Sequence, residues 1–261
     1  MKKALNLFRI EGIFLKYNLI AMLQYRLSYF LSVFYELFDA LTMMAYFYIV
    51  FGSTSSIAGW AQSQIFTLVV VSYFINIVCV MLYIGMTSIP EYIHSGQLDL
   101  LLLKPVNKRF FLTFRSPNSV QILNFLVAAV GIGYCVAKSD AVAINIICFF
   151  IALLCSIILM YSVMCILISL SFWFIRIGNS WNIIELLNQM SAKPKNIFPM
   201  PIQLLLTLFI PALVIINNPA YILHFQYDIF LRQTLPITVI FYISSVIVFR
   251  LGLKKYSSAG G

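Results

Sequence analysis

Hydrophobic residues in this chain occur in long unbroken runs rather than in the alternating or one-sided patterns of soluble strands and helices. Such runs predict membrane-spanning helices, because about 20 apolar residues are needed to cross the hydrocarbon core. Six spans are expected, at about 27–51, 65–86, 119–137, 142–172, 202–216 and 234–249. The fifth is short, and Pro211 predicts a kink in it. The pattern therefore predicts an all-α polytopic membrane protein, folded as a single transmembrane domain over residues 1–261.

The segment before the first span predicts an amphipathic helix over residues 1–26. Lys2, Arg9 and Lys16 are seven residues apart and share one face, while apolar side chains lie on roughly the opposite face. Such a helix is expected to lie along the inner leaflet, with its cations near anionic lipid headgroups. A solvated lead-in to the first span is the alternative.

Two later segments are less regular. Residues 179–190 combine apolar positions at helical spacing with polar ones, which favours a second interfacial helix; a polar half-span is the alternative. Residues 217–233 are semi-polar, contain Pro219 and several aromatic residues, and are interpreted as an extracytoplasmic re-entrant region.

Composition agrees with a membrane protein. The chain is 62% hydrophobic and 10% charged, with a mean hydropathy of +0.97, whereas soluble domains have ~45–50% apolar and ~25% charged residues. The net charge of +9 does not indicate nucleic acid, because Lys and Arg gather in the cytoplasmic loops of membrane proteins. With the N-terminus inside, the inner segments 1–26, 87–118, 173–200 and 250–261 hold 15 of the 17 basic residues. This asymmetry predicts that both termini are cytoplasmic.

The inner segment 87–106 begins with the signals of a short helix. Ser88 and Glu91 have the spacing of a capping box, and Pro90 is tolerated in a first turn, where backbone amides lack helical partners. Gly96 predicts the end of the helix. A short capped helix between two spans is suited to insertion into a partner's cleft; an ordinary surface loop is the alternative.

Polar residues inside the predicted spans are a second candidate site. Glu36 and Asp39 are three residues apart on one face of the first span, and Asn76 lies in the second. Charges at membrane depth cost several kcal/mol unless paired or hydrated. The three residues are therefore candidates for the lining of a translocation path. Contacts between helices, or a position of Glu36 near the interface, are the alternatives.

Signals for chemistry within the chain are absent. No glycine is followed by Lys-Ser or Lys-Thr, as a phosphate-binding loop requires. The five cysteines all lie in apolar stretches, as small buried side chains do. His94 and His224 are expected on opposite sides of the membrane. We therefore expect no catalytic, metal or cofactor-binding residues in this chain.

The order of parts resembles the membrane subunit of an ATP-binding-cassette (ABC) exporter of the type 2 permease class, the ABC-2 family. The more specific match is the sequence IHSGQLDLLLLKPV (Ile93–Val106), in which Gln97 replaces a common threonine. Prolines around the fifth span agree (Pro194, Pro199, Pro211 and Pro219), as does a tail from Gly252 through Tyr256 and Ser258 to Gly260.

The resemblance implies a coupling helix that docks on a separate ABC ATPase, which binds ATP and Mg²⁺. The residues implied in ATPase coupling are Ser88, Pro90, Glu91, Tyr92, Ile93, His94, Gly96, Leu98, Asp99, Lys104 and Pro105. Asp99 and Lys104 are candidates to tether the segment to the partner or to the N-terminal helix, or else only cap the turn.

The resemblance also implies a second permease copy or a paralogue as partner, contacts with membrane lipids, and a place in the bacterial cytoplasmic (inner) membrane. The main alternative is an ion- or proton-coupled secondary transporter, favoured by Glu36 and Asp39. A structural or lipid-binding scaffold is a third possibility. The substrate stays open.

Overall fold

The computed structural model describes residues 26–174 and 180–256. The interfacial helix expected at 1–26 lies outside the described residues, apart from Arg26, where α2 begins. The long helices are α2 (Arg26–Phe51), α3 (Gln62–Tyr83), α7 (Ile122–Lys138), α8 (Ala143–Ser169) and α12 (Leu235–Lys255). The shorter α-helices are α4 (Ile89–His94), α5 (Gln97–Leu102), α6 (Lys108–Phe114), α9 (Ser180–Ser191), α10 (Met200–Leu204) and α11 (Ala212–His224). Single turns of 3₁₀ or π helix join them: η1 (Ile84–Ser88), η2 (Ser119–Gln121), η3 (Leu170–Phe172), η4 (Lys195–Ile197), η5 (Leu205–Phe209) and η6 (Phe230–Thr234).

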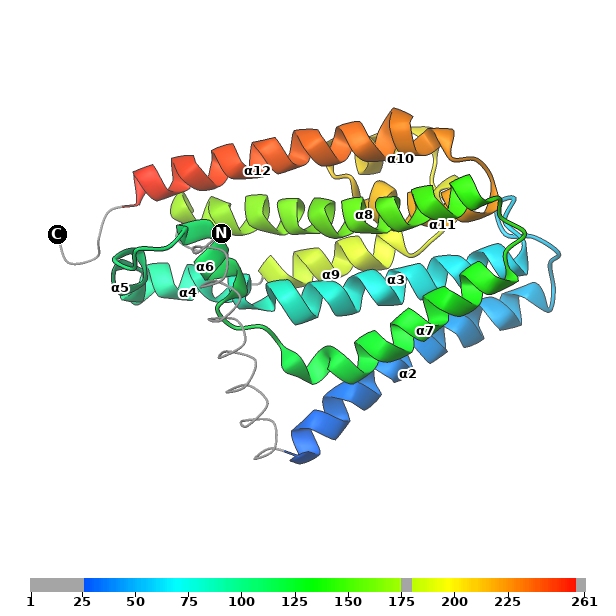
Figure 1. Ribbon diagram of the computed structural model, residues 1–261, viewed down its shortest axis with the longest axis horizontal. Helices are drawn as coiled ribbons and strands as arrows, with labels where there is room; N and C mark the ends of the chain where they lie inside the picture. Colours follow the sequence, from blue (N-terminus) through cyan, green and yellow to red (C-terminus); the bar gives the residue numbers. More distant parts are fainter. Residues whose placement is uncertain (1–25, 175–179, 257–261) are drawn as a thin grey trace.

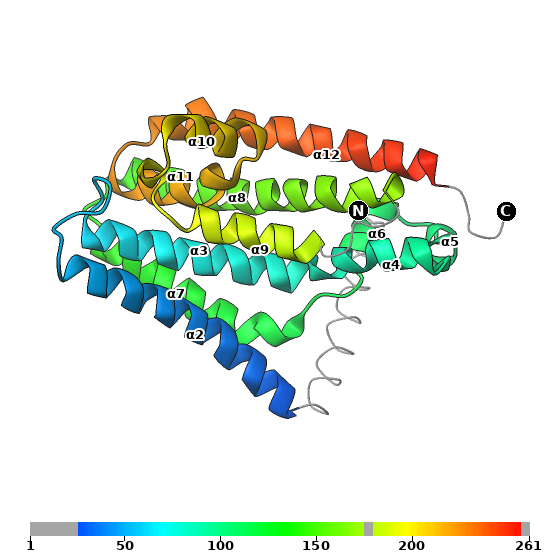
Figure 2. The ribbon, with the colours of Figure 1, turned by 180° about the vertical axis from the view of Figure 1, so that it is seen from behind.

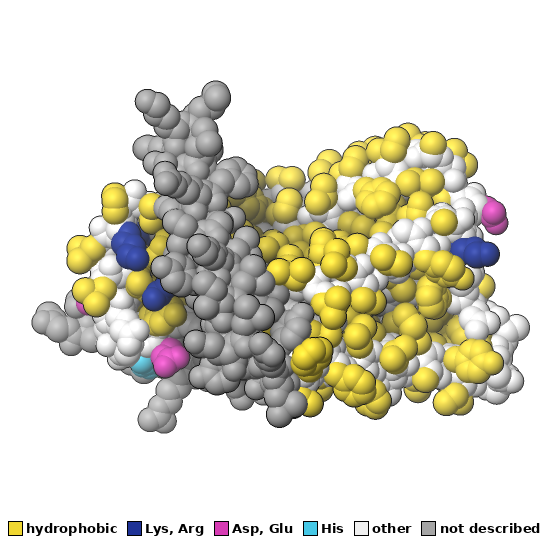
Figure 3. Space-filling model, turned by 60° about the horizontal axis from the view of Figure 1, so that its bottom comes forward, with side chains coloured by type: hydrophobic (Ala, Val, Ile, Leu, Met, Phe, Trp, Pro, Cys, Tyr) yellow, Lys and Arg dark blue, Asp and Glu magenta, His cyan; other side chains and the backbone are white. Residues whose placement is uncertain are grey.

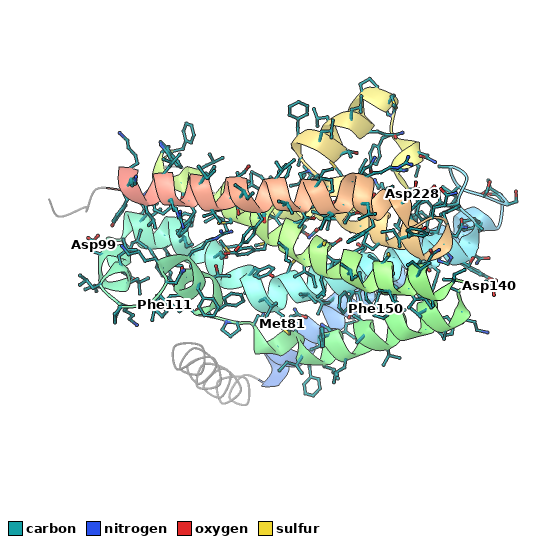
Figure 4. All side chains as sticks on the ribbon, turned by 45° about the horizontal axis from the view of Figure 1, so that its top comes forward. Met81, Asp99, Phe111, Asp140, Phe150 and Asp228 are labelled. Atoms are coloured by element: carbon teal, nitrogen blue, oxygen red, sulfur yellow. The ribbon has the colours of Figure 1, made fainter. Side chains whose placement is uncertain are left out.

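The long helices lie roughly along one axis, with different structures at its two ends (Figure 1). One end carries η1, α4, α5 and α6 and is called the motif end below. The other carries the turn 52–61 between α2 and α3 and is called the loop end. In Figure 4, Asp99 lies at the motif end, while Asp140 and Asp228 lie at the loop end.

The core is built around α3 and α8, which pack against α11, α7 and α12. Fully buried side chains such as Leu68, Ile75, Phe149 and Met164 fill the space between them. By contrast, α2 packs mainly against α3 and the α7 region among the described helices. Of its apolar stretch within Phe30–Phe51, 11% is buried, against 61% for the stretch within Gln62–His94 that includes α3. The rest of α2 is an exposed apolar surface.

This distribution is that of a membrane protein. Four helices are long and apolar enough to span a bilayer, or five if the bent pair α10–η5 and α11 is one span, while α7 is a shorter apolar helix. On the part of the surface not drawn in grey in Figure 3, charged side chains lie at the two ends, and the surface between them is largely hydrophobic. The described residues form helices and no named strand, so the predicted all-α polytopic membrane fold is confirmed.

The predicted fifth span, 202–216, is bent at Pro211, as the sequence predicts, and the contacts of its two ends favour a re-entrant unit over a span. α10 and η5 are bent by 97° relative to α11 at the break around Pro211, which starts α11. Both ends of this unit lie near the loop end. Just before the unit, Asn196 Nδ2 donates to Ala58 O at 3.1 Å. At its last residue, His224 Nε2 lies 2.7 Å from Thr67 Oγ1, near the start of α3. The chain therefore enters and leaves residues 200–224 at the same end, as a re-entrant unit does.

The re-entrant region expected at 217–233 stays a prediction; its first part, residues 217–224, is the second half of α11 in this bent unit. Two polar residues of this part are inside the protein: Asn217 and Asn218 are 1% and 3% exposed. Asn217 Nδ2 donates to the carbonyls of Ser191 and Lys193, and its Oδ1 accepts from Lys195 N. Asn218 Nδ2 donates to Thr234 Oγ1.

Residues 180–191 form α9, which lies beside α3 and packs against α11 and α8 (Figure 2). Asn188 contacts Asn76 in the middle of α3, and by Asn196 the chain has reached the loop end. The structure thus favours the half-span over the interfacial helix. Lys193 and Lys195 therefore lie away from the motif end, although the count of basic residues predicts them on the same side of the membrane as that end.

Candidate functional site

The segment between α3 and α7 forms the first candidate site. Ser88 is the N-cap position of α4 and Pro90 lies in its first turn, as predicted, but the predicted capping box is not formed: Ser88 has αR backbone angles and makes no side-chain capping bond. The helix instead runs on from α3 through η1 into α4, as one segment from Gln62 to His94. A capping box is not needed, because the preceding turns already supply carbonyl partners for the amides of α4.

The predicted stop at Gly96 is confirmed. Gly96 has φ 70°, in the left-handed region, and separates α4 from α5. Ser95 closes α4, since its backbone N and its Oγ both lie 2.9 Å from Glu91 O. Because side-chain-bearing residues other than Asn and Asp rarely adopt such a φ, the glycine sets the angle between the two short helices.

The α4–α5 segment has a buried side and an exposed side. Ile89 and Leu98 are buried in one cluster with Met86 of η1 and Leu112 of α6. The cluster also contains Cys165 and Ile168 of α8 and Phe249 of α12. The exposed side chains are Glu91, His94, Ser95, Gln97, Leu100, Leu103, Lys104 and Pro105. Leu100 and Leu103 are 68% and 80% exposed, although they are large and apolar. The segment is therefore anchored to the bundle on one side and open on the other.

The remaining predicted coupling residues lie at the boundary between these two sides. Ser88, Pro90, Tyr92, Ile93 and Asp99 are half-buried. Arg115 lies 5.2 Å above the Tyr92 ring, and Lys104 Nζ lies 4.7 Å from the centre of the Phe111 ring on α6. These cation–π contacts connect α4 and the turn after α5 to the α6 region.

The C-terminal end of α12 meets the same segment. Gly252 packs directly against the Phe172 ring, and the Phe172 and Tyr256 rings are 6.3 Å apart. Burial and the nearby Asp99 carboxylate raise the pKa of the Tyr256 hydroxyl. Asp99 thus lies next to the C-terminal segment of its own chain. The glycine and tyrosine of the tail pattern form the contact surface between α12 and the motif end.

A chain of polar side chains in the bundle is the second candidate site. Asn76 Nδ2 donates to Glu36 Oε2 at 3.3 Å, and Asn188 Nδ2 donates to Asn76 Oδ1 at 3.2 Å. The chain joins α2, α3 and α9. Asp39 is exposed, and both Asp39 and Glu185 lie close enough to Glu36 to interact electrostatically. Glu36 also lines an open groove of about 760 Å³ between α2, the end of α3 and the start of α7.

The structure therefore brings together Glu36 and Asn76, two of the three predicted path residues, and places Asp39 nearby. Asn188 and Glu185, their neighbours, were not predicted. The signal for them is the set of polar residues in 179–190, a stretch that the sequence favours as an interfacial helix. Among the described residues, no group of three His, Cys, Asp or Glu side chains could hold a metal ion.

A comparison with known families covers both candidate sites except Glu36. Residues 37–260 match the family model described as ABC-2 family transporter protein. No curated protein and no solved structure matches the chain significantly. The matched region includes α4, α5, Asn76, Asn188 and the end of α12, and it supports a permease-type role in membrane transport. The chain belongs to the ABC-2 transporter family.

Proposed function

We propose that this chain is the membrane subunit of an ABC exporter and that its α4–α5 segment docks on a separate ATPase subunit. The observation that carries this proposal is the two-sided build of the segment: Ile89 and Leu98 are fully buried in the bundle, while Leu100 and Leu103 are exposed. Large exposed apolar side chains at the polar end of a membrane protein indicate a surface that a partner covers.

The anchorage gives a route for coupling. The ATPase binds ATP and Mg²⁺, and its closure moves the docked segment. Because α4 continues α3 without a break, and because Ile89 and Leu98 pack against α8 and α12, a displacement of α4 and α5 is transmitted to these helices. The ATPase would thereby bias the bundle between two packings, inward- and outward-open.

A second permease, identical or paralogous, would complete the transport path. The exposed apolar surface of α2 and the groove lined by Glu36 support this assignment. In such a pair, Glu36, Asp39, Asn76 and Asn188 would face the path or the second copy, where charged groups at membrane depth find hydration or partners.

The test is purification of the tagged chain in a mild detergent from its native membrane, with all co-purifying proteins identified. We expect an ABC ATPase in a one-to-one ratio. The variant Leu100→Asp/Leu103→Asp should lose the ATPase and keep its membrane level, because it places charges in the docking surface. Val142→Asp, at an exposed apolar residue of the loop end, is the matched control and should retain the ATPase. Retention by both variants would contradict docking at α5.

An ion- or proton-coupled secondary transporter is the second candidate, and the Glu36–Asn76–Asn188 chain favours it. The variants Glu36→Gln and Asp39→Asn separate the two candidates. If the protein is an ABC exporter, the variants should still export substrate at any external pH. If it is a proton-coupled transporter, they should lose the part of the transport that depends on the proton gradient.

A further inference from the structure

Arg109 occupies an unusual place at the motif end. Its guanidinium lies between two aromatic rings, 4.8 Å from the centre of Tyr161 on α8 and 5.2 Å from that of Tyr242 on α12. Its Nη2 donates to Ser245 Oγ at 2.7 Å. Ser245 donates its own hydrogen to Tyr242 O, so its oxygen is positioned to accept. Arg109 thus joins α6 to both α8 and α12.

These contacts leave part of the guanidinium unsatisfied. Nε is buried and has no hydrogen-bond partner among the described residues. The ion pair found among the described residues joins Arg232 and Asp228, at the other end of the bundle. Within the described part of the chain, Arg109 therefore has no carboxylate partner. A partly buried cation without a counter-charge is costly, and guanidinium groups prefer planar bidentate partners such as phosphate.

A cavity next to the guanidinium has room for such a partner. It measures about 250 Å³ and is lined by Tyr83, Asn107, Arg109, Phe110, Phe114, Tyr161 and Tyr242. That is many times the volume that a single water molecule needs. The Oδ1 atom of Asn107 accepts from Phe110 N, so its amide nitrogen is left as a further donor. The lining therefore combines a cation and a neutral donor with aromatic walls.

We propose that this cavity binds a phosphate-bearing anion, with Arg109 as the residue that contacts the phosphate. The chemistry fits the headgroup of an anionic phospholipid in the leaflet at the motif end, and it also fits a soluble phosphate ester. The bound anion would supply the missing counter-charge and clamp α6 to α8 and α12. This site does not depend on ATPase docking, because none of the residues that line the cavity lies on α4 or α5.

Binding can be measured by native mass spectrometry of the purified chain in a nonionic detergent. The probes are dioctanoyl phosphatidylglycerol, dioctanoylglycerol, which lacks the phosphate, and glycerol 3-phosphate, which lacks the acyl chains. We expect the phosphatidylglycerol to bind at least about tenfold more tightly than dioctanoylglycerol, because charge-assisted hydrogen bonds contribute that much. Equal binding of glycerol 3-phosphate would support the site and identify a soluble anion as its ligand.

Two variants show whether the binding belongs to Arg109. Arg109→Gln should weaken phosphatidylglycerol binding about 10- to 100-fold, and Arg109→Lys should weaken it less, because it keeps the charge. Arg115→Gln removes an equal charge at the same end, outside the cavity, and should bind as the wild type does. The proposal would be overturned if Arg109→Gln and Arg115→Gln weakened phosphatidylglycerol binding equally. It would also be overturned if the wild type bound dioctanoylglycerol as tightly as phosphatidylglycerol. If Arg109→Gln does not fold, the wild-type comparison still decides whether the phosphate is recognised.

Discussion

Close packing between α12 and the Phe172 side chain at the motif end depends on one residue, Gly252. A Cβ atom added there would overlap the Phe172 ring and would lie 3.2 Å from Phe172 Cβ. Phe172 is also in contact with Phe249 and Tyr256, so it has little room to move. The glycine of the tail pattern thus serves close packing rather than a turn.

We predict that Gly252→Ala destabilises the protein by about 1–3 kcal/mol, the usual cost of overpacking. The measurement is the midpoint of unfolding in detergent micelles. Gly133→Ala is the control, because a Cβ at Gly133 on α7 meets no atom within 4 Å, and it should be neutral or slightly stabilising. Replacing Phe172 with a smaller residue in the same chain should restore part of the loss. A Gly252→Ala protein as stable as Gly133→Ala would contradict the packing argument.

At the scale of elements, the joint between α4 and α5 depends on the left-handed backbone of Gly96. A β-branched side chain costs roughly 1–2 kcal/mol in this conformation, while asparagine adopts it more readily. We predict that Gly96→Val changes the angle between α4 and α5 and lowers the co-purified ATPase by about 5- to 30-fold. Gly96→Asn should keep it near the wild-type level.

Both Gly96 variants must reach the membrane in equal amounts for the comparison to apply. Both variants replace Gly96 with a residue that has a side chain, but only asparagine readily adopts the left-handed conformation. A difference between them therefore reports the backbone angle and not the added side chain. Loss of the ATPase from both variants, or from neither, would show that the left-handed angle does not govern docking.

The same segment shows how far sequence reasoning reaches. Gly96 could be recognised as a stop because its preference is local. The missing capping bond at Ser88 could not be predicted, because it follows from the helical turns that continue from α3 into α4. Likewise, Asn217 and Asn218 look like surface residues in the sequence, while in the fold they hydrogen-bond to Ser191, Lys193 and Thr234. Apolar run length predicted the long helices, since it does not depend on tertiary partners.

The polar chain was only half predictable for a related reason. Glu36 and Asn76 stand out because they lie in otherwise apolar runs. Asn188 lies among other polar residues in α9 and gives no such contrast. Its pairing with Asn76 follows from α9 packing beside α3, a contact between residues more than one hundred positions apart.

At the scale of the whole molecule, the path of the chain between the two ends has a direct consequence. Along the described residues, the chain passes between the motif end and the loop end on α2, α3, α7, α8, α9 and α12, while residues 200–224 return to the end from which they start. Lys193 should therefore face the same side of the membrane as Ser55 in the α2–α3 turn, and Gln97 should face the opposite side. The positive-inside count, which placed Lys193 with Gln97, predicts the reverse.

Single cysteine substitutions at the exposed positions Ser55, Lys193 and Gln97 can decide this with a membrane-impermeant maleimide. Four of the five native cysteines are buried and the fifth is half-buried, so background labelling should be low. We predict that Ser55→Cys and Lys193→Cys are labelled from one side of sealed vesicles and Gln97→Cys only from the other. Labelling of Lys193→Cys together with Gln97→Cys would mean that α9 does not carry the chain across, and that the bent pair around Pro211 is a span after all.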